Sequence, residues 1–175
     1  LGSIEIDQER YKWLEFYKIK FKVASLIIKI FLYMLLGLKL LAFGGSKISI
    51  DNVPYNPSDA ITYKGLMLSG LPNCIFFAGY TNASWTLKSD LTSEYASRLF
   101  KLMDKRNYSF FMPKVENQNM NISPLLNLNS GYIHRSSHLF PKQGSKLPWK
   151  LYQNYFFDYT MLRINKIRDK NLILN

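Results

Sequence analysis

The sequence predicts a chain of mixed helix and strand, in the α/β class with α+β as the alternative, from three observations. The run CIFFA at 74–78 has the composition of a short buried strand. Apolar residues recur with helical spacing from Trp85 onward and again near the C-terminus, at 149–163. The strands are too few for a complete doubly wound sheet, so the predicted α/β architecture is an incomplete one.

The composition excludes an intrinsically disordered chain and a disulfide framework. Hydrophobic residues make up 47% of the 175 residues, which is enough to favour a buried core. The net charge of +11 comes from scattered basic residues, so it favours a solvated surface and we expect no nucleic-acid partner. Cys74 is the single cysteine, which fits a reducing, cytoplasmic location and a small core residue better than a nucleophile.

The segment before residue 44 is apolar and basic, and two interpretations of it remain open. Residues 23–42 are long enough for one bilayer crossing. However, Lys29 lies well inside that stretch and would cost about 2.5–3.5 kcal/mol in a membrane. The first interpretation is an N-terminal apolar helix packed against protein. The alternative is a membrane-associated basic protein anchored by residues 23–43, with no retained cofactor.

The remaining elements follow from local patterns. SKISI at 46–50 alternates as a strand does, and DNVP and NPSD after it are typical turn sequences. The helix from Trp85 has Ser84 or Thr86 as its N-cap and ends near Lys105–Arg106–Asn107, where cations favour the dipole. Its expected apolar face consists of Leu87, Leu91, Tyr95, Leu99 and Leu102.

Chemical motifs are few. His134 and His138 have helical i, i+4 spacing, but no third ligand accompanies them, so we expect no metal site. The chain contains neither the G-x-S-x-G nucleophile motif nor the G-x-G-x-x-G and P-loop phosphate motifs, and we assign no catalytic residue. The small polar loop 79–84 joins the predicted strand to the helix, where open α/β proteins hold ligands. An ordinary capped turn is the alternative explanation for that loop.

Longer stretches carry a resemblance to a known family. LLAFGGSKISID, GYTNASWTLK, NSGYIHR and PKQGSKLPW resemble the C-terminal portion of the class B flavin-dependent monooxygenases, in the Baeyer–Villiger-like, ethionamide-activating branch. The resemblance covers about 37–163. It implies that residues 37–175 are the C-terminal segment of the FAD domain of a flavoprotein with two Rossmann-type domains. Residues 1–36 resemble nothing in the family, and we expect them to form a separate apolar and basic extension that is helical.

The family resemblance also implies a cofactor site and a reaction. FAD and NADP are the cofactors of such enzymes, which insert oxygen into ketones or soft heteroatoms. The segment matching 79–87 lies over the flavin ring in this family, with backbone amides at its pyrimidine edge. The cofactor-binding residues implied in this chain are Gly79, Tyr80, Thr81, Asn82, Trp85, Thr86 and Leu87.

The chain also departs from the family pattern. An Ala-Thr-Gly element beside the flavin corresponds to Leu35, Leu36 and Gly37, where only the glycine is retained. Both dinucleotide-binding glycine motifs are missing. We therefore expect a fragment that is inactive alone, and a separate N-terminal half as the partner that supplies those motifs.

Overall fold

A computed structural model describes residues 41–116, 119–125 and 136–175 of the chain. They belong to one unit of the structure, Leu40–Asn175. The predicted N-terminal helix, the 1–36 extension, the 23–43 segment up to residue 40, and His134 lie outside the described residues. Among the helices within these ranges, none has the length and apolar character that crossing a membrane requires.

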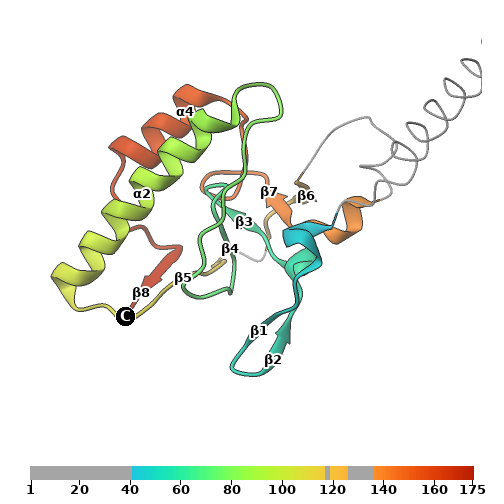
Figure 1. Cartoon of the computed structure of the whole chain (residues 1–175), viewed down its shortest axis with the longest axis horizontal. Helices are drawn as coiled ribbons and strands as arrows, with labels where there is room; N and C mark the ends of the chain where they lie inside the picture. The colour runs from blue at the N-terminus through green and yellow to red at the C-terminus, as the bar shows by residue number, and fades with distance from the viewer. Residues whose placement is uncertain (1–40, 117–118, 126–135) are drawn as a thin grey trace, which may run out of the picture. The chain divides into compact units, whose positions relative to one another are not determined.

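The described residues combine helices with short antiparallel strand pairs (Figure 1). The pairs are β1 (Ile48–Ile50) with β2 (Val53–Tyr55), β3 (Thr62–Tyr63) with β4 (Met67–Leu68), β5 (Phe111–Pro113) with β8 (Leu172–Leu174), and β6 (Ile122–Pro124) with β7 (Lys142–Gly144). The helical elements are α2 (Trp85–Arg106), α4 (Tyr155–Tyr159), a π-helix (Thr160–Ile164) and three short 3₁₀ turns (Ala42–Gly45, Pro57–Asp59 and Ser137–Leu139). Helix and strand are therefore mixed as predicted, and an isolated parallel bridge joins Ile61 to Lys142.

Helix α2 begins and ends where the sequence predicts. Ser84 is its N-cap residue, although its side chain makes no capping hydrogen bond to the backbone. At the C-terminus, Asn107 adopts the left-handed conformation (φ 56°) and donates its N–H to Asp104 O and Met103 O. Asparagine tolerates this conformation better than most residues, which explains why the helix ends there. Lys105 and Arg106 occupy the last turn, as expected for the helix dipole.

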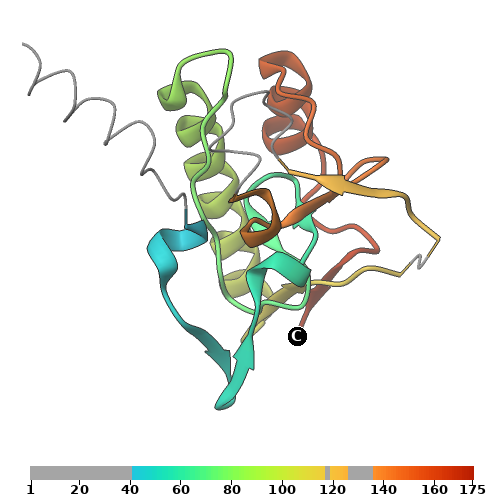
Figure 2. The same ribbon diagram turned by 90° about the vertical axis from the view of Figure 1, so that its right-hand side faces the viewer.

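The predicted strand at 46–50 is confirmed as β1, which forms a hairpin with β2. Asp51 and Asn52 connect the two strands with positive φ angles of 50° and 65°. In a type I′ turn, whose twist matches that of the paired strands, both central residues need positive φ angles. Asn and Asp adopt such angles readily. Figures 1 and 2 agree that this hairpin projects from the end of the unit away from α4.

The prediction of a strand at 74–78 is wrong. In the described part of the chain these residues belong to no helix and to no strand pair. The Phe76 N–H donates to Leu66 O at 2.9 Å, and no regular ladder continues from that bond. The apolar side chains are still used for packing, since Ile75, Cys74 and Phe76 contact the two buried clusters. Cys74, expected as a small core residue, is only partly buried and packs at the edge of the second cluster.

The C-terminal helix begins later than predicted. Trp149 and Leu151 form hydrogen bonds with residues of β7 instead. Trp149 O accepts from the Gly144 N–H, and the Leu151 N–H donates to Gln143 Oε1. Gln153 has a φ of 52°, which interrupts any helix at that point. Asn154 then caps α4 by accepting hydrogen bonds from the N–H groups of residues 156 and 157.

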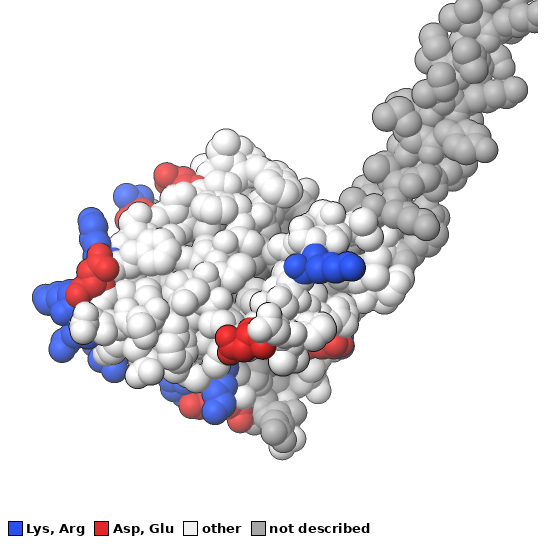
Figure 3. Space-filling model, turned by 60° about the horizontal axis from the view of Figure 1, so that its bottom comes forward, with Lys and Arg blue, Asp and Glu red and all other residues white. Residues whose placement is uncertain are grey.

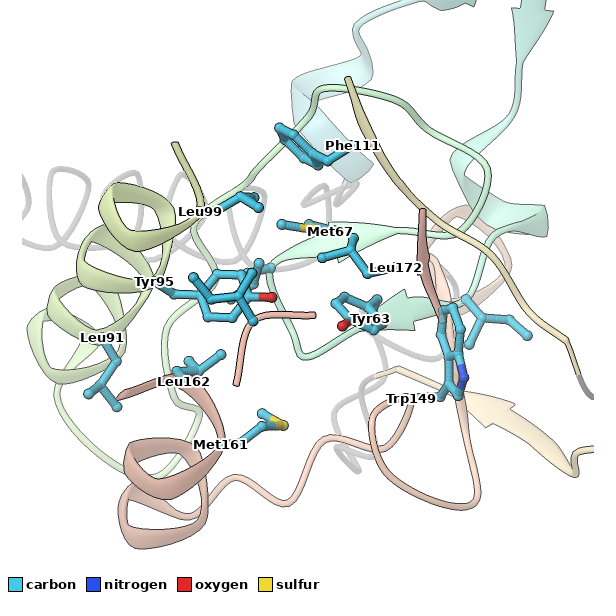
Figure 4. Close-up of a cluster of buried hydrophobic side chains, with 13 residues drawn as sticks. Tyr63, Met67, Leu91, Tyr95, Leu99, Phe111, Trp149, Met161, Leu162 and Leu172 are labelled. Carbon is cyan, nitrogen blue, oxygen red and sulfur yellow. The ribbon is translucent and has the colours of Figure 1, made fainter. Parts of the chain in front are cut away.

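The main core lies between the helices and the paired strands (Figure 4). Leu91, Tyr95 and Leu99 point from one face of α2 into this core and are fully buried, as the spacing predicts. Helix α4 and the π-helix lie beside α2 in both ribbon views (Figures 1 and 2). Arg98 joins these elements by donating to Leu162 O at 2.8 Å and Asn165 O at 2.9 Å. These bonds satisfy carbonyls that a helix end otherwise leaves without partners.

Charged side chains do not gather into one patch on the face seen in Figure 3. Lysines, arginines and acids are interspersed along its edges, and a broad central area of the described surface carries few charges. A surface of mixed signs is typical of the solvated exterior that the sequence indicates.

Candidate functional site

The loop predicted to cover a ligand enters α2 at the end where α4 packs (Figure 1). Tyr80 is 3% exposed, whereas every residue of the following run 81–87 is exposed. The run includes Trp85, which is 62% exposed, and Leu87, which is 41% exposed. Large apolar side chains at a helix N-terminus therefore face outward here, although the predicted apolar face placed Leu87 inward.

Gly79 and Trp85 lie in direct contact. A Cβ added to Gly79 would be 2.2 Å from Cγ and Cδ2 of Trp85, so the indole lies where a side chain would be. The glycine therefore allows the indole to fold back over the backbone of the loop.

Tyr80 anchors the loop to a buried ion pair. Its hydroxyl donates to Asp158 Oδ2 at 2.7 Å, and Lys88 Nζ lies 2.8 Å from the same oxygen. The Lys88 ammonium is buried, and this close contact lacks the alignment of a hydrogen bond. Burial lowers the pKa of Lys88 and the negative charge of Asp158 opposes that change. Burial also raises the pKa of Tyr80, and the hydrogen bond to Asp158 adds to this effect.

Gln153 supports the exposed part of the loop from the segment before α4. Its side-chain Oε1 accepts from the Thr81 N–H at 2.9 Å and from Thr81 Oγ1 at 3.3 Å. Its backbone carbonyl accepts from Asn82 Nδ2 at 3.2 Å. The first part of the loop is thus held by Tyr80 on Asp158 and by Thr81 and Asn82 on Gln153.

The first turn of α2 leaves its backbone donors available. The Ser84 hydroxyl pairs with Thr86 Oγ1 at 2.7 Å instead of accepting from the helix N–H groups. The first N–H groups of a helix have no intrahelical acceptor and carry partial positive charge. An exposed indole, an exposed leucine and these donors can together bind a planar heterocycle with oxygen or nitrogen acceptors at its edge.

The seven predicted residues lie in the loop before α2 and in the first turn of that helix, and the structure gives them different roles. Five of them (Thr81, Asn82, Trp85, Thr86 and Leu87) are exposed, whereas Tyr80 is buried and Gly79 lies under the indole. Sequence reasoning missed Lys88, Asp158 and Gln153, which hold the loop. The helical position of Lys88 on the side of Leu91 and Thr92 was the one local indication that it is buried. Within the described residues, no cluster of acidic, histidine or cysteine side chains suits a metal ion.

Comparisons with known proteins agree on one group of relatives. No protein-family model matches the chain, and no solved structure matches it. The chain is 41% identical over 136 residues to the FAD-containing monooxygenase EthA of Mycolicibacterium smegmatis, and 42% identical over 136 residues to EthA of Mycobacterium tuberculosis. It is 38% identical over 134 residues to the probable FAD-binding monooxygenase AlmA of Acinetobacter baylyi.

These matches cover most of this chain and a minor part of each relative. The EthA alignments include 78% of this chain and 28% of the relative, and the AlmA alignment includes 76% and 27%. The predicted resemblance is therefore confirmed, and FAD is the cofactor that the relatives' names give. The chain belongs to the EthA-like FAD-containing monooxygenases, and it spans little more than a quarter of the length of these relatives.

Proposed function

We propose that this chain supplies the part of an FAD-dependent monooxygenase that covers the edge of the flavin ring. The observation that carries the proposal is the exposed run 81–87 at the N-terminus of α2. Hydrogen bonds from Tyr80 to Asp158 and from Thr81 to Gln153 fix the start of this run. Large apolar side chains that are exposed together at one site often mark a surface that a ligand or partner covers. The family of the chain supports FAD as that ligand.

The residues of the loop fit a flavin ring by their chemistry. The backbone N–H groups of Trp85, Thr86 and Leu87 would donate to its carbonyl edge, and the N-terminal end of α2 would favour negative charge there. FAD supplies the redox and oxygen chemistry when it is bound. The chain would position the ring and exclude water from one side of it. NADP remains a prediction of the family resemblance for the second cofactor.

Activity requires more than these residues supply. No G-x-G-x-x-G sequence occurs in the 175 residues, so the pyrophosphate of FAD has no glycine loop of the usual kind in this sequence. We propose that the chain is inactive alone and that a second polypeptide with that motif completes the site. Oxygen insertion into ketones or soft heteroatoms would then be the activity of the completed protein.

Backbone amide shifts of the purified chain during titration with FAD test the proposal directly. Contact with the ring edge should shift the amide signals of Trp85, Thr86 and Leu87 in a saturable way. The affinity should be weak, with a dissociation constant of about 1 mM, because the chain provides contacts to the ring alone. Riboflavin, which lacks the pyrophosphate, should produce the same shifts with similar affinity.

The matched variants are Trp85→Ala and Phe100→Ala. Both remove an exposed aromatic side chain from α2, but Phe100 lies toward the C-terminal half of the helix. Trp85→Ala should abolish saturable binding and Phe100→Ala should leave it unchanged. Equal loss in the two variants, or shifts that avoid residues 85–87 altogether, would show that the loop does not contact flavin.

A further inference from the structure

A cavity of about 430 Å³ is lined by residues of the β6–β7 pair and of the segment after β7, up to Gln153. This volume is in the range of small-molecule sites. Its wall includes Thr81, which belongs to the flavin-covering loop, and Gln153, which holds that loop. The cavity therefore shares Thr81 with the candidate flavin site, and the other residues that line it lie outside that site.

The described residues in the wall of the cavity include one cation and no acid. Lys150 is the one charged residue among the described residues that line it. The Lys150 ammonium lies 5.0 Å from the centroid of the Tyr152 ring, and no carboxylate pairs with it among the described residues. In the sequence, no acidic residue occurs between Glu116 and Asp158. An anion in this cavity would therefore find a cation without a carboxylate partner, and no acidic side chain among the described residues of the wall.

The rest of the wall is divided between apolar and hydrogen-bonding groups. Ile122, Leu125 and Leu151 contribute hydrocarbon surface. Hydroxyl and amide groups lie around them, from Thr81, Asn121, Ser123, Gln143, Ser145 and Gln153. The Gln143 amide is already used, since it donates to Pro124 O at 2.9 Å and accepts from the Leu151 N–H at 3.1 Å. This bonding fixes one side of the cavity in place.

We propose that the cavity binds a small organic carboxylate. Its anionic group would pair with Lys150, and its hydrocarbon body would lie against Leu151 and its apolar neighbours. A purely inorganic anion would leave the apolar part of the wall unused, and a neutral ligand would leave Lys150 unpaired. The proposal goes beyond flavin covering and does not depend on it, because none of its contacts involves Trp85 or Leu87.

Titration of the chain with hexanoate, followed by amide chemical shifts, tests this assignment. Saturable shifts should appear at Ser123, Ser145 and Gln153 and should extend to Thr81. Hexanamide has nearly the same shape without the charge, and it should bind about fivefold or more weakly. Inorganic phosphate has the charge without the hydrocarbon body, and it should also bind more weakly than hexanoate.

Two charge-removing variants separate a specific pair from general attraction to a basic surface. Lys150→Gln should weaken hexanoate binding about fivefold or more. Lys146→Gln removes the same charge from an exposed residue that does not line the cavity, and it should change the affinity less than about twofold. Equal effects of the two variants, equal binding of hexanamide, or tighter binding of phosphate would each overturn the proposal. Loss of flavin binding would leave all these results unchanged, so the two proposals fail separately.

Discussion

The indole of Trp85 occupies the space that a side chain on Gly79 would need. A Cβ at position 79 would lie 2.2 Å from two carbons of the indole, far inside van der Waals contact. Gly79 is not among the described glycines with positive φ, so a left-handed backbone does not explain the glycine. The requirement for glycine is therefore steric, and it connects the start of the loop to the exposed aromatic ring at the start of α2.

This contact predicts a coupled pair of substitutions. Gly79→Ala should lower the free energy of unfolding by about 1–3 kcal/mol, because the new methyl group displaces the ring. Trp85→Ala removes the obstacle, so Gly79→Ala in that background should cost less than about 0.5 kcal/mol. Urea unfolding of the two single variants and the double variant measures the coupling. The same loss in both backgrounds would show that the ring does not restrict position 79.

The buried ion pair predicts a large effect at Asp158. Asp158→Asn should lower the free energy of unfolding by about 3–5 kcal/mol at neutral pH, because the buried Lys88 loses its counter-charge. Asp90→Asn is the control, since Asp90 lies exposed on α2. It should change the stability by less than about 0.5 kcal/mol. Similar effects of the two substitutions would contradict the role given to the pair.

The cost of Asp158→Asn should depend on pH in a definite direction. Burial lowers the pKa of Lys88 below 10.5 in the folded state, and Asp158 opposes this. Without Asp158 the pKa of Lys88 in the folded state falls further. The pH range below 10.5 in which the unfolded state binds more protons than the folded state is therefore wider in the variant. Stability then rises with pH in that range. The difference from the natural chain should therefore shrink between about pH 7 and 9.5, below the ionisation of unfolded tyrosines. A constant difference would mean that Lys88 stays charged in the variant.

Local sequence patterns predicted α2 well because its determinants are local. The spacing of Leu91, Tyr95 and Leu99 defines its buried face, and Asn107 marks its end. The pattern at 149–163 was misleading because the aromatic side chains of its first part are used in another way. Trp149 packs edge-on against Tyr63, with ring centroids 5.3 Å apart, and the helix cannot form until after Gln153.

The residues that hold the candidate site in place could not be predicted from the sequence, for a different reason. Lys88 is charged, and charged residues are almost never fully buried unless they are paired. Its partner Asp158 is distant in the sequence, so no spacing rule connects them. The same is true of Thr81 and Gln153. The loop itself is a prediction of the family resemblance, whereas the residues that hold it became evident only from the fold.

The C-cap of α2 predicts a pair of opposite substitutions at Asn107. Its φ of 56° lies in the left-handed region, which glycine adopts without cost. Asn107→Ala should lower the free energy of unfolding by about 1 kcal/mol, and Asn107→Gly should leave it unchanged or raise it slightly. Thermal and urea unfolding measure both. Greater stability for the alanine variant than for the glycine variant would contradict this cap.

Gln153 predicts a change in the motion of the loop with little change in global stability. Gln153→Ala removes the Oε1 atom that accepts from the Thr81 N–H at 2.9 Å. Because Thr81 is exposed, water can replace the lost acceptor, and global stability should fall by at most about 1 kcal/mol. Hydrogen exchange at the Thr81 amide should nevertheless become about fivefold faster, since local opening no longer breaks that bond. Gln153→Glu retains an acceptor oxygen and should keep exchange slow. Equally fast exchange in the glutamate variant would mean that the side-chain oxygen does not hold the loop.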